Sequence, residues 1–416
     1  MTPTIDYPDG LLLVLPVPFK QTIDGHLLIE EQASNGIDQW ADFFSNVTVI
    51  APTFGDTGQD SKSGGTIVWR EAARLRHHDT ITLVPLPMAY HLSAFAANFA
   101  SGRRTLLDHI NRNRYLQFAI GGLIGDWAAF GASLAHSRRR LYSIHTDRVE
   151  HEVLLQVTRG ASPLRRLKAQ VIGRLMRAYH RSVIRGCSLG LWHGNDCYLA
   201  YSPWSRENHL IHDIHLKPED AISPTDLAAK LYSATETPLR IAYAGRLDPM
   251  KAPLQWLRAL AQARDLGVDF EAVWLGDGPL NEEFHALIDQ LRLRTRIRAP
   301  GFVDRSTLLD ELRRAHLFVF THITPESPRC LLEALVAAAP IIGYDNPFAR
   351  DLCANGYGGG AFVPIGDHQA LGEEIASLAA DRTLLQQLIL QASENGKRFN
   401  DQAVFEERSQ LIRKYS

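Results

Sequence analysis

Short apolar runs alternate with amphipathic helical stretches along most of this chain, most regularly from residue 239 onward. Between the runs, apolar residues recur at helical spacing, as they do over 280–291. Alternation of this kind predicts a parallel sheet that is covered by helices on both faces. The expected strands of this half are 239–244, 270–276, 317–320, 341–344 and 361–363.

The first half shows the same alternation with more insertions. An amphipathic stretch lies near 27–44, and the polar, weakly periodic segment 213–237 is typical of an interdomain linker. We therefore expect an α/β protein with two doubly wound, Rossmann-like domains facing a central cleft, over 1–212 and 238–398. The expected strands of the first half are 11–16, 47–51, 81–85, 118–124, 141–144 and 188–192.

Composition narrows the class of protein. The chain is 45% hydrophobic and 22% charged, which is ordinary for a soluble globular protein. A net charge of −2 argues against a general nucleic-acid-binding protein. The four cysteines form no CxxC pair, which favours free thiols over a disulfide frame or a zinc site. With no basic-then-apolar signal peptide at the N-terminus, we expect a cytoplasmic protein.

Two cations follow the first expected strand of the second half. Arg246 and Lys251 lie in Gly245-Arg246-Leu247-Asp248-Pro249-Met250-Lys251, directly behind the strand 239–244. A strand-to-helix turn places side chains at the carboxyl edge of a parallel sheet, where ligands of open α/β folds bind. An arginine fork and a lysine point charge together suit a diphosphate, although two solvated loop cations would give the same pattern. No GxGxxG follows any strand, which argues against a dinucleotide-binding dehydrogenase.

Four motifs of the second half, taken in order, resemble the donor-binding domain of glycosyltransferase family 4, a retaining family with the GT-B fold. They are Gly245-Arg246-Leu247…Lys251, Trp274–Pro279 (WLGDGP), Gly301–Val303 (GFV) and Pro325–Leu335 (PESPRCLLEAL). The resemblance covers roughly 239–400 and is specific because independent pieces agree. It implies a GT-B fold in which the C-terminal segment 399–416 crosses back onto the first domain.

The resemblance also implies roles on the donor side. Arg246 and Lys251 would hold the diphosphate of a nucleotide-sugar, and Glu333 would accept hydrogen bonds from the ribose hydroxyls. Gly276 and Asp277 would pass close to the nucleotide, which small residues permit. For Glu333, a carboxylate that matches the helix dipole is the alternative interpretation.

One motif departs from the family pattern. The family has two glutamates separated by seven residues, but counting back from Glu333 reaches Pro325, and Glu326 lies one residue late. Glu326 either contacts the donor sugar or is a surface loop acid. Pro328 removes a backbone donor near the helix start, and Arg329 can replace it by binding phosphate or a sugar carboxylate.

The first half offers weaker candidates. His145 follows the expected strand 141–144, similar to a family strand that ends in a histidine near the donor sugar and acceptor. A satisfied structural histidine is the alternative. Asp126, Trp127 and Asp147 are candidates for the acceptor pocket, with capping and packing as the alternative roles of Asp126 and Trp127.

Residues 164–185 form a basic amphipathic segment. Such a helix can lie on anionic lipid at the inner face of a membrane, which would suit a lipid-linked acceptor. A domain helix with a solvated cationic face is the alternative. Its cations are Arg165, Arg166, Lys168, Arg174, Arg177, Arg181 and Arg185.

Together these features favour a retaining glycosyltransferase that moves a sugar from a nucleotide-diphosphate sugar to a saccharide or lipid-linked acceptor. The chain has no Asp-x-Asp pair, so we expect a metal-independent reaction without a further cofactor. The leaving phosphate would then be neutralised by Arg246, Lys251 and helix-end amides. The alternatives are a non-catalytic nucleotide-sugar-binding partner subunit and a sugar-nucleotide epimerase of the same fold. Bacterial polysaccharide or glycoconjugate synthesis is the expected setting.

Overall fold

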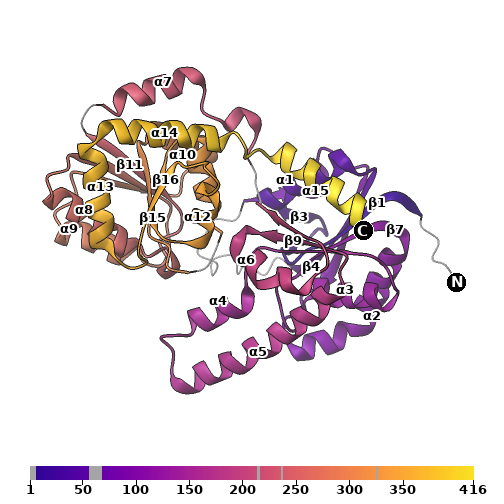
Figure 1. The fold of residues 1–416 in the computed structure, drawn as a ribbon. Helices are drawn as coiled ribbons and strands as arrows, with labels where there is room; N and C mark the ends of the chain where they lie inside the picture. The colour runs from indigo at the N-terminus through magenta and orange to yellow at the C-terminus, as the bar shows by residue number, and fades with distance from the viewer. Residues whose placement is uncertain (1–5, 56–67, 213–215, 236–237, 325–326) are drawn as a thin grey trace. The chain divides into compact units, whose positions relative to one another are not determined.

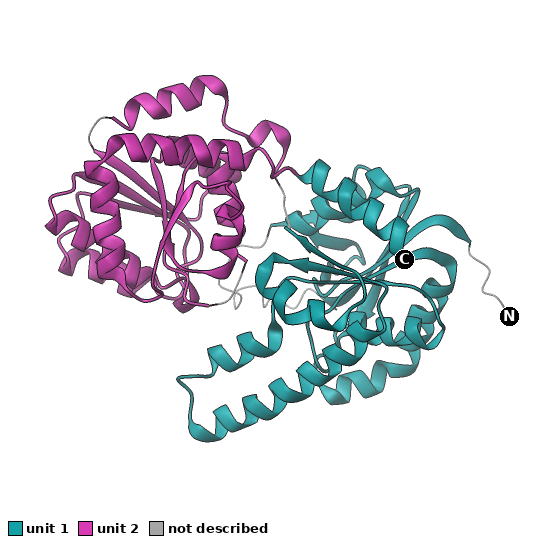
Figure 2. Ribbon diagram, in the orientation of Figure 1, with its two compact units in different colours: residues 1–62, 66–215, 401–416 teal, residues 63–65, 216–400 magenta. Residues whose placement is uncertain are grey.

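The computed structural model describes residues 6–55, 68–212, 216–235, 238–324 and 327–416. These residues divide into two compact units (Figure 2). Unit 1 comprises the described residues up to 212 together with 401–416, and unit 2 comprises those within 216–400. None of the described helices is long and apolar enough to cross a membrane.

Unit 1 is built on a ten-stranded sheet, in which the apolar run 11–14 is the fully buried C-terminal half of β1. The strand order is β10-β9-β8-β7-β1-β4-β2-β3-β5, and β6 pairs with β4. Only the pairings of β3 with β2 and with β5 are antiparallel. The strands are β1 (Tyr7–Val14), β2 (Phe19–Gln21), β3 (Leu27–Glu30), β4 (Asn46–Gly55), β5 (Trp69–Glu71), β6 (Ile81–Pro87), β7 (Asn113–Ala119), β8 (Ser143–Thr146), β9 (Leu189–His193) and β10 (Asn208–Ile211).

The helices of unit 1 pack around this sheet (Figure 1). The last helix returns to α1, where the Phe405 ring lies edge-on to Trp40 at 5.0 Å and Gln39 donates to Asp401 at 2.9 Å. The C-terminal segment is therefore part of unit 1. The helices are α1 (Glu31–Phe43), α2 (Leu92–Arg112), α3 (Trp127–Ser137), α4 (Glu150–Val157), α5 (Pro163–Arg185), α6 (Gly194–Tyr201) and α15 (Asp401–Tyr415).

Two elements of unit 1 differ from the sequence prediction. The expected amphipathic stretch 27–44 divides into β3 and α1. The strand expected over 118–124 is β7, which already ends at Ala119. It ends there because the Asp126 carboxylate accepts the N–H groups of Gly121 and Gly122, at 2.9 and 2.8 Å, and holds them in a loop.

Unit 2 follows the predicted alternation closely. Its six strands are all parallel, in the order β13-β12-β11-β14-β15-β16. The chain leaves β11 toward β12 and later returns to its other side as β14, so the strand order reverses between β11 and β14. Ligands of open α/β sheets bind at such a switch point. The strands are β11 (Leu239–Ala244), β12 (Phe270–Leu275), β13 (Ile297–Gly301), β14 (Leu317–Phe320), β15 (Ile341–Tyr344) and β16 (Gly360–Val363).

The helices of unit 2 include one that we expected to lie in a linker. Residues 224–233 form α7, and its Lys230 is 3% exposed. The Lys230 ammonium donates to the carbonyls of Leu312 at 3.1 Å and Ala337 at 2.6 Å, which fixes α7 to the ends of two other helices. The helices are α7 (Pro224–Ser233), α8 (Pro253–Asp265), α9 (Asn281–Gln290), α10 (Arg305–Arg314), α11 (Arg329–Val336), α12 (Pro347–Cys353), α13 (His368–Ala380) and α14 (Arg382–Gly396).

Candidate functional site

The turn after β11 carries both predicted phosphate-binding cations. Asp248 is 7% exposed, and its Oδ1 accepts from the N–H groups of Met250 at 2.9 Å and Lys251 at 3.3 Å. Its Oδ2 lies 3.2 Å from Arg246 Nη2, while more than half of the Arg246 side chain is exposed. One carboxylate thus holds the short turn Pro249–Lys251 and orients the guanidinium beside it.

The same turn is joined to the loop after β14, on the other side of the switch point. The Thr321 hydroxyl donates to the carbonyls of Lys251 at 2.8 Å and Ala252 at 3.1 Å. The Ile323 N–H donates to the Met250 carbonyl at 3.1 Å. These bonds fix the backbone of Lys251 relative to β14, so the Lys251 side chain extends from a fixed point at this edge of the sheet.

A buried aromatic pair lies behind the turn. His322 is fully buried, and its Nε2 lies 2.6 Å from the Tyr243 hydroxyl. Burial, together with the positive charge of Lys251, holds the pKa of His322 well below its usual value. The imidazole is therefore neutral and adds no charge to the two cations. The Tyr243 ring lies against Trp274, with centroids 4.0 Å apart.

Four of these residues were missed by the sequence analysis: Tyr243, Asp248, Thr321 and His322. Thr321 and His322 directly follow the strand 317–320, and polar residues in that position were a usable signal. Asp248 lies inside the motif that drew attention to Arg246 and Lys251.

The loop after β12 lies against the turn after β11. Gly276 has φ +139°, and a Cβ at this position would come 2.3 Å from the Gly245 carbonyl oxygen. The Leu247 N–H donates to the Asp277 carbonyl at 3.1 Å, and the Asp277 carboxylate accepts from Gly278 N–H at 2.7 Å and from Asn281. The hydrogen bond from Asn281 lowers the pKa of Asp277. The close approach of two loops thus requires glycine at position 276, and the predicted contact of Gly276 and Asp277 with a nucleotide stays a prediction.

Glu333 and Arg329 lie four residues apart on α11, on the same side of the helix. The Glu333 side chain is 20% exposed, and its Oε1 lies 3.9 Å from Arg305 Nη1. Burial raises the pKa of Glu333, and the charges of Arg305 and Arg329 partly oppose that shift. A carboxylate with spare acceptor capacity is therefore held next to two guanidinium groups. Glu326 lies outside the described residues.

In unit 1 the structure brings His145 and Asp147 together. His145 is the next-to-last residue of β8 and is 7% exposed, and its Nε2 lies 3.1 Å from Asp147 Oδ1. The Asp147 side chain is 54% exposed, so this pair reaches solvent at the carboxyl edge of the unit 1 sheet.

The other two acceptor candidates have structural roles. Both Asp126 oxygens accept backbone N–H groups, those of residues 121 and 122 and those of Ala128 and Ala129, so the carboxylate caps α3. Trp127 is 2% exposed in the core of unit 1, and its Nε1–H donates to the Pro87 carbonyl at 2.9 Å. The geometry favours capping and packing over lining an acceptor pocket.

Metal ligation has no candidate among the residues that the structure describes, since no group of three or more His, Cys, Asp or Glu side chains is suitably placed. The chemistry available in unit 2 is anion binding. The two cations follow β11, and α11 with its carboxylate follows the neighbouring strand β14, so both belong to the carboxyl edge of the same parallel sheet, where cations and helix N-termini bind anions.

Comparison with known sequences gives a match over unit 2. Residues 229–397 match the family described as glycosyl transferases group 1. Over 199 residues the chain is 27% identical to the candidate colanic acid biosynthesis glycosyltransferase WcaL of Salmonella typhimurium. The aligned residues cover 46% of this chain and 49% of WcaL. The chain thus spans about half the length of the curated relatives it matches.

Solved structures extend the likeness to the whole chain. The crystal structure of Anabaena HepE in complex with UDP has a TM-score of 0.65 at 15% identity, covering 96% of this chain and 98% of that one. WaaG, a glycosyltransferase involved in lipopolysaccharide biosynthesis, gives 0.63 at 13% identity, covering 97% and 99%. The protein therefore has the GT-B fold of these structures, with two Rossmann-like units, and its second unit matches the glycosyl transferases group 1 family.

Proposed function

We propose that this protein is a glycosyltransferase that moves a sugar from a nucleotide-diphosphate sugar to a saccharide or lipid-linked acceptor. The observation that carries the proposal is the pair Arg246 and Lys251, on a turn that Asp248 holds at the switch point of a domain that matches a glycosyltransferase family. HepE was solved with UDP and with UDP-glucose, and WcaL is named for colanic acid biosynthesis, which supports a nucleotide-sugar donor and bacterial polysaccharide synthesis.

The proposed donor site divides the work among few groups. Arg246 and Lys251 neutralise the diphosphate, with added donors from the N-terminus of α11, and Glu333 accepts from the ribose hydroxyls. Gly276, Asp277, Glu326 and Arg329 complete the proposed donor-side set.

We propose a metal-independent reaction with retention at the anomeric carbon. The bond between that carbon and the phosphate oxygen breaks, and the acceptor oxygen bonds to the carbon on the same face. The acceptor proton passes to the leaving phosphate oxygen, so no strong protein base is required. The charge that develops on the phosphate is stabilised by cations that are already in place before the reaction. For His145 and Asp147 we propose contacts with sugar hydroxyls.

A screen against UDP-, GDP-, ADP- and TDP-sugars tests this function, read out as thermal stabilisation and as nucleotide release with acceptors present. Stabilisation by one nucleotide is expected, and it should be lost in Arg246→Ala and Glu333→Ala. It should persist in Arg258→Ala, which removes an exposed arginine from α8 of the same unit. Stabilisation without nucleotide release would favour a non-catalytic partner, and an epimerised donor would favour an epimerase. No stabilisation by any nucleotide would contradict the proposal.

A further inference from the structure

An apolar stripe runs along the solvent side of α5. Leu164, Leu167, Val171 and Leu175 are 78%, 58%, 50% and 57% exposed. Their spacing of three, four and four residues places them on one face of the helix. The opposite face is the one packed against unit 1, through Ala169, Gly173, His180, Val183 and Ile184. The stripe therefore has no counterpart within the described part of unit 1.

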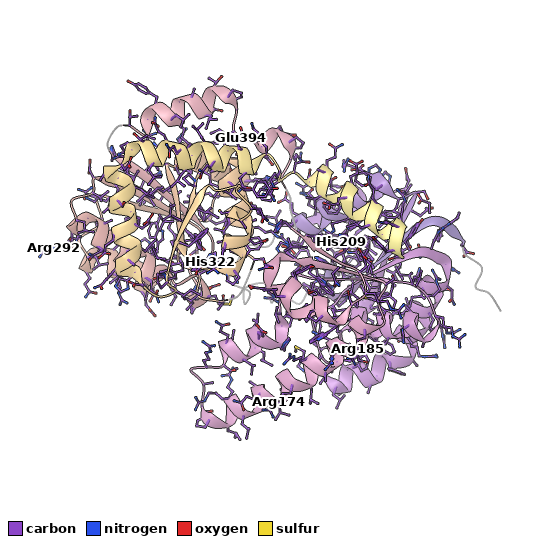
Figure 3. The ribbon with its side chains drawn as sticks, viewed as in Figure 1. Arg174, Arg185, His209, Arg292, His322 and Glu394 are labelled. Atoms are coloured by element: carbon purple, nitrogen blue, oxygen red, sulfur yellow. The ribbon has the colours of Figure 1, made fainter. Side chains whose placement is uncertain are left out.

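Cations flank the stripe on both sides. Arg165, Arg166, Lys168 and Arg174 are exposed, and none of them forms an ion pair with another described residue. Residues 153–195 contain eight Lys and Arg and no Asp or Glu, in a chain whose net charge is −2. The cations of this segment are thus not offset by acids within it, and Figure 3 shows Arg174 on it.

Further along the helix the cations turn back toward unit 1. Arg177 and Arg181 lie over the Trp204 ring, with guanidinium carbons 5.8 and 6.0 Å from its centroid. The available charge is therefore strongest over the first half of α5. There α4 lies alongside α5 (Figure 1) and adds two more exposed apolar side chains, Leu155 at 38% and Val157 at 64%.

We propose that this face of α5, with the exposed end of α4, binds the surface of an anionic lipid bilayer. Apolar side chains centred between cations match a membrane interface, where they enter the acyl boundary while the cations contact headgroup phosphates. A soluble polyanion would leave the four aliphatic side chains in water. A second copy of the same face would bring cations against cations, with no acid on α5 to offset them. The proposal does not depend on the donor site.

Flotation with vesicles of phosphatidylcholine alone, and of phosphatidylcholine with phosphatidylglycerol, tests the proposal on the chain of 416 residues. We expect binding to the anionic vesicles that weakens as salt rises. Arg165→Gln/Arg166→Gln/Lys168→Gln should weaken it at least about tenfold, because each cation near an anionic surface contributes severalfold. Leu167→Ser/Val171→Ser/Leu175→Ser should abolish the binding that remains at high salt.

Matched controls separate this face from general charge or hydrophobicity. Arg103→Gln/Arg104→Gln removes two exposed arginines from α2, and Leu266→Ser removes an exposed leucine from unit 2; neither should alter flotation. Thermal midpoints show whether each variant is folded. Equal binding to neutral vesicles, binding of heparin but not of vesicles, or a dimer lost in the leucine variant would each overturn the proposal.

Discussion

The Asp248 carboxylate lies 3.2 Å from the Arg246 guanidinium, and its second oxygen accepts the Lys251 N–H at 3.3 Å. One nearly buried side chain thus positions both residues that we propose as diphosphate ligands. Two separate interactions could account for its importance: the cap on the turn of Lys251 and the ion pair with Arg246.

Asp248→Ala should lower donor affinity severalfold and the free energy of unfolding by about 1 kcal/mol, since it removes the cap. Asp248→Asn and Asp248→Ser keep an acceptor for the backbone and should restore both quantities. Calorimetric titration with the identified nucleotide and denaturant unfolding measure them. Asp381→Ala, which removes the cap of α14 in the same unit, should lose similar stability without losing affinity. Failure of Asp248→Asn to recover affinity would instead assign the effect to the ion pair.

Arg246→Ala and Lys251→Ala should each weaken donor binding about tenfold to a hundredfold, the range of hydrogen bonds to charged groups. Arg246→Lys should recover only part of the loss, because an ammonium cannot replace the planar fork. Comparing the loss of affinity for the nucleoside diphosphate with the loss for its nucleoside isolates the contribution of the phosphates to binding. If both ligands lose affinity equally, the cations do not contact the diphosphate.

The fold of unit 2 could be predicted from local pattern, whereas much of the site could not. Strands such as 317–320 are short apolar runs with clear helices between them, so periodicity located them. Thr321 and His322 belong to the site because β14 returns beside β11. The spacing of residues along the sequence does not show which strands will be neighbours in the sheet. Residues 224–233 appeared to be a linker because their sequence is polar. The structure buries Lys230 nevertheless, because its side chain donates hydrogen bonds to the carbonyls at the ends of two helices. Asp126 likewise stood at the end of an expected strand, and its carboxylate decides where that strand ends.

Asp126→Ala should destabilise the protein by roughly 2 kcal/mol or more, because it leaves several backbone N–H groups without their acceptor. Nucleotide binding should be unchanged, since the cap belongs to unit 1. Denaturant unfolding and thermal shift with the nucleotide measure the two effects. Asp126→Asn, which retains one acceptor oxygen, should fall between the parent and the alanine variant. An acceptor role would appear as a raised KM for acceptor in Asp126→Asn at unchanged stability.

Glu333→Gln should raise the thermal midpoint at neutral pH while it reduces the shift that nucleotide induces. Burial raises the pKa of Glu333, so the folded state binds more protons than the unfolded state between the usual and the raised pKa. Stability therefore falls as pH rises through that window, and the neutral amide avoids the cost. The difference in midpoint should vanish at acidic pH. Glu311→Gln on α10, which interrupts an ion pair with Arg298 of β13, controls for loss of charge. A lower midpoint with an unchanged nucleotide shift would mean that Glu333 serves mainly as the partner of Arg305.

His316 should make unit 2 sensitive to acid. Its Nδ1 accepts the Arg240 N–H at 3.1 Å and its Nε2 lies 3.0 Å from the Ser233 hydroxyl, so the ring is held neutral. Burial lowers the pKa of His316 to about 3, with the charges of Arg240 and Lys230 adding to the shift. Between the usual pKa of about 6.5 and the folded-state pKa of about 3, the unfolded state binds a proton at His316 that the folded state does not. Stability is thus lost as pH falls, by up to about 1.4 kcal/mol per pH unit from this group.

His316→Gln removes the titrating ring, so the stability of this variant should depend less on pH below about 6.5 than the stability of the parent does. At neutral pH the variant is expected to be less stable than the parent. The measurement is the difference between the unfolding midpoints of the variant and the parent at each pH from about 7.5 to about 5. Taking the difference cancels the contributions of the other buried histidines, which both proteins share. His285→Gln, at an exposed position on α9, should leave the parent profile unchanged. A difference that does not narrow as pH falls would show that His316 stabilises unit 2 by packing alone.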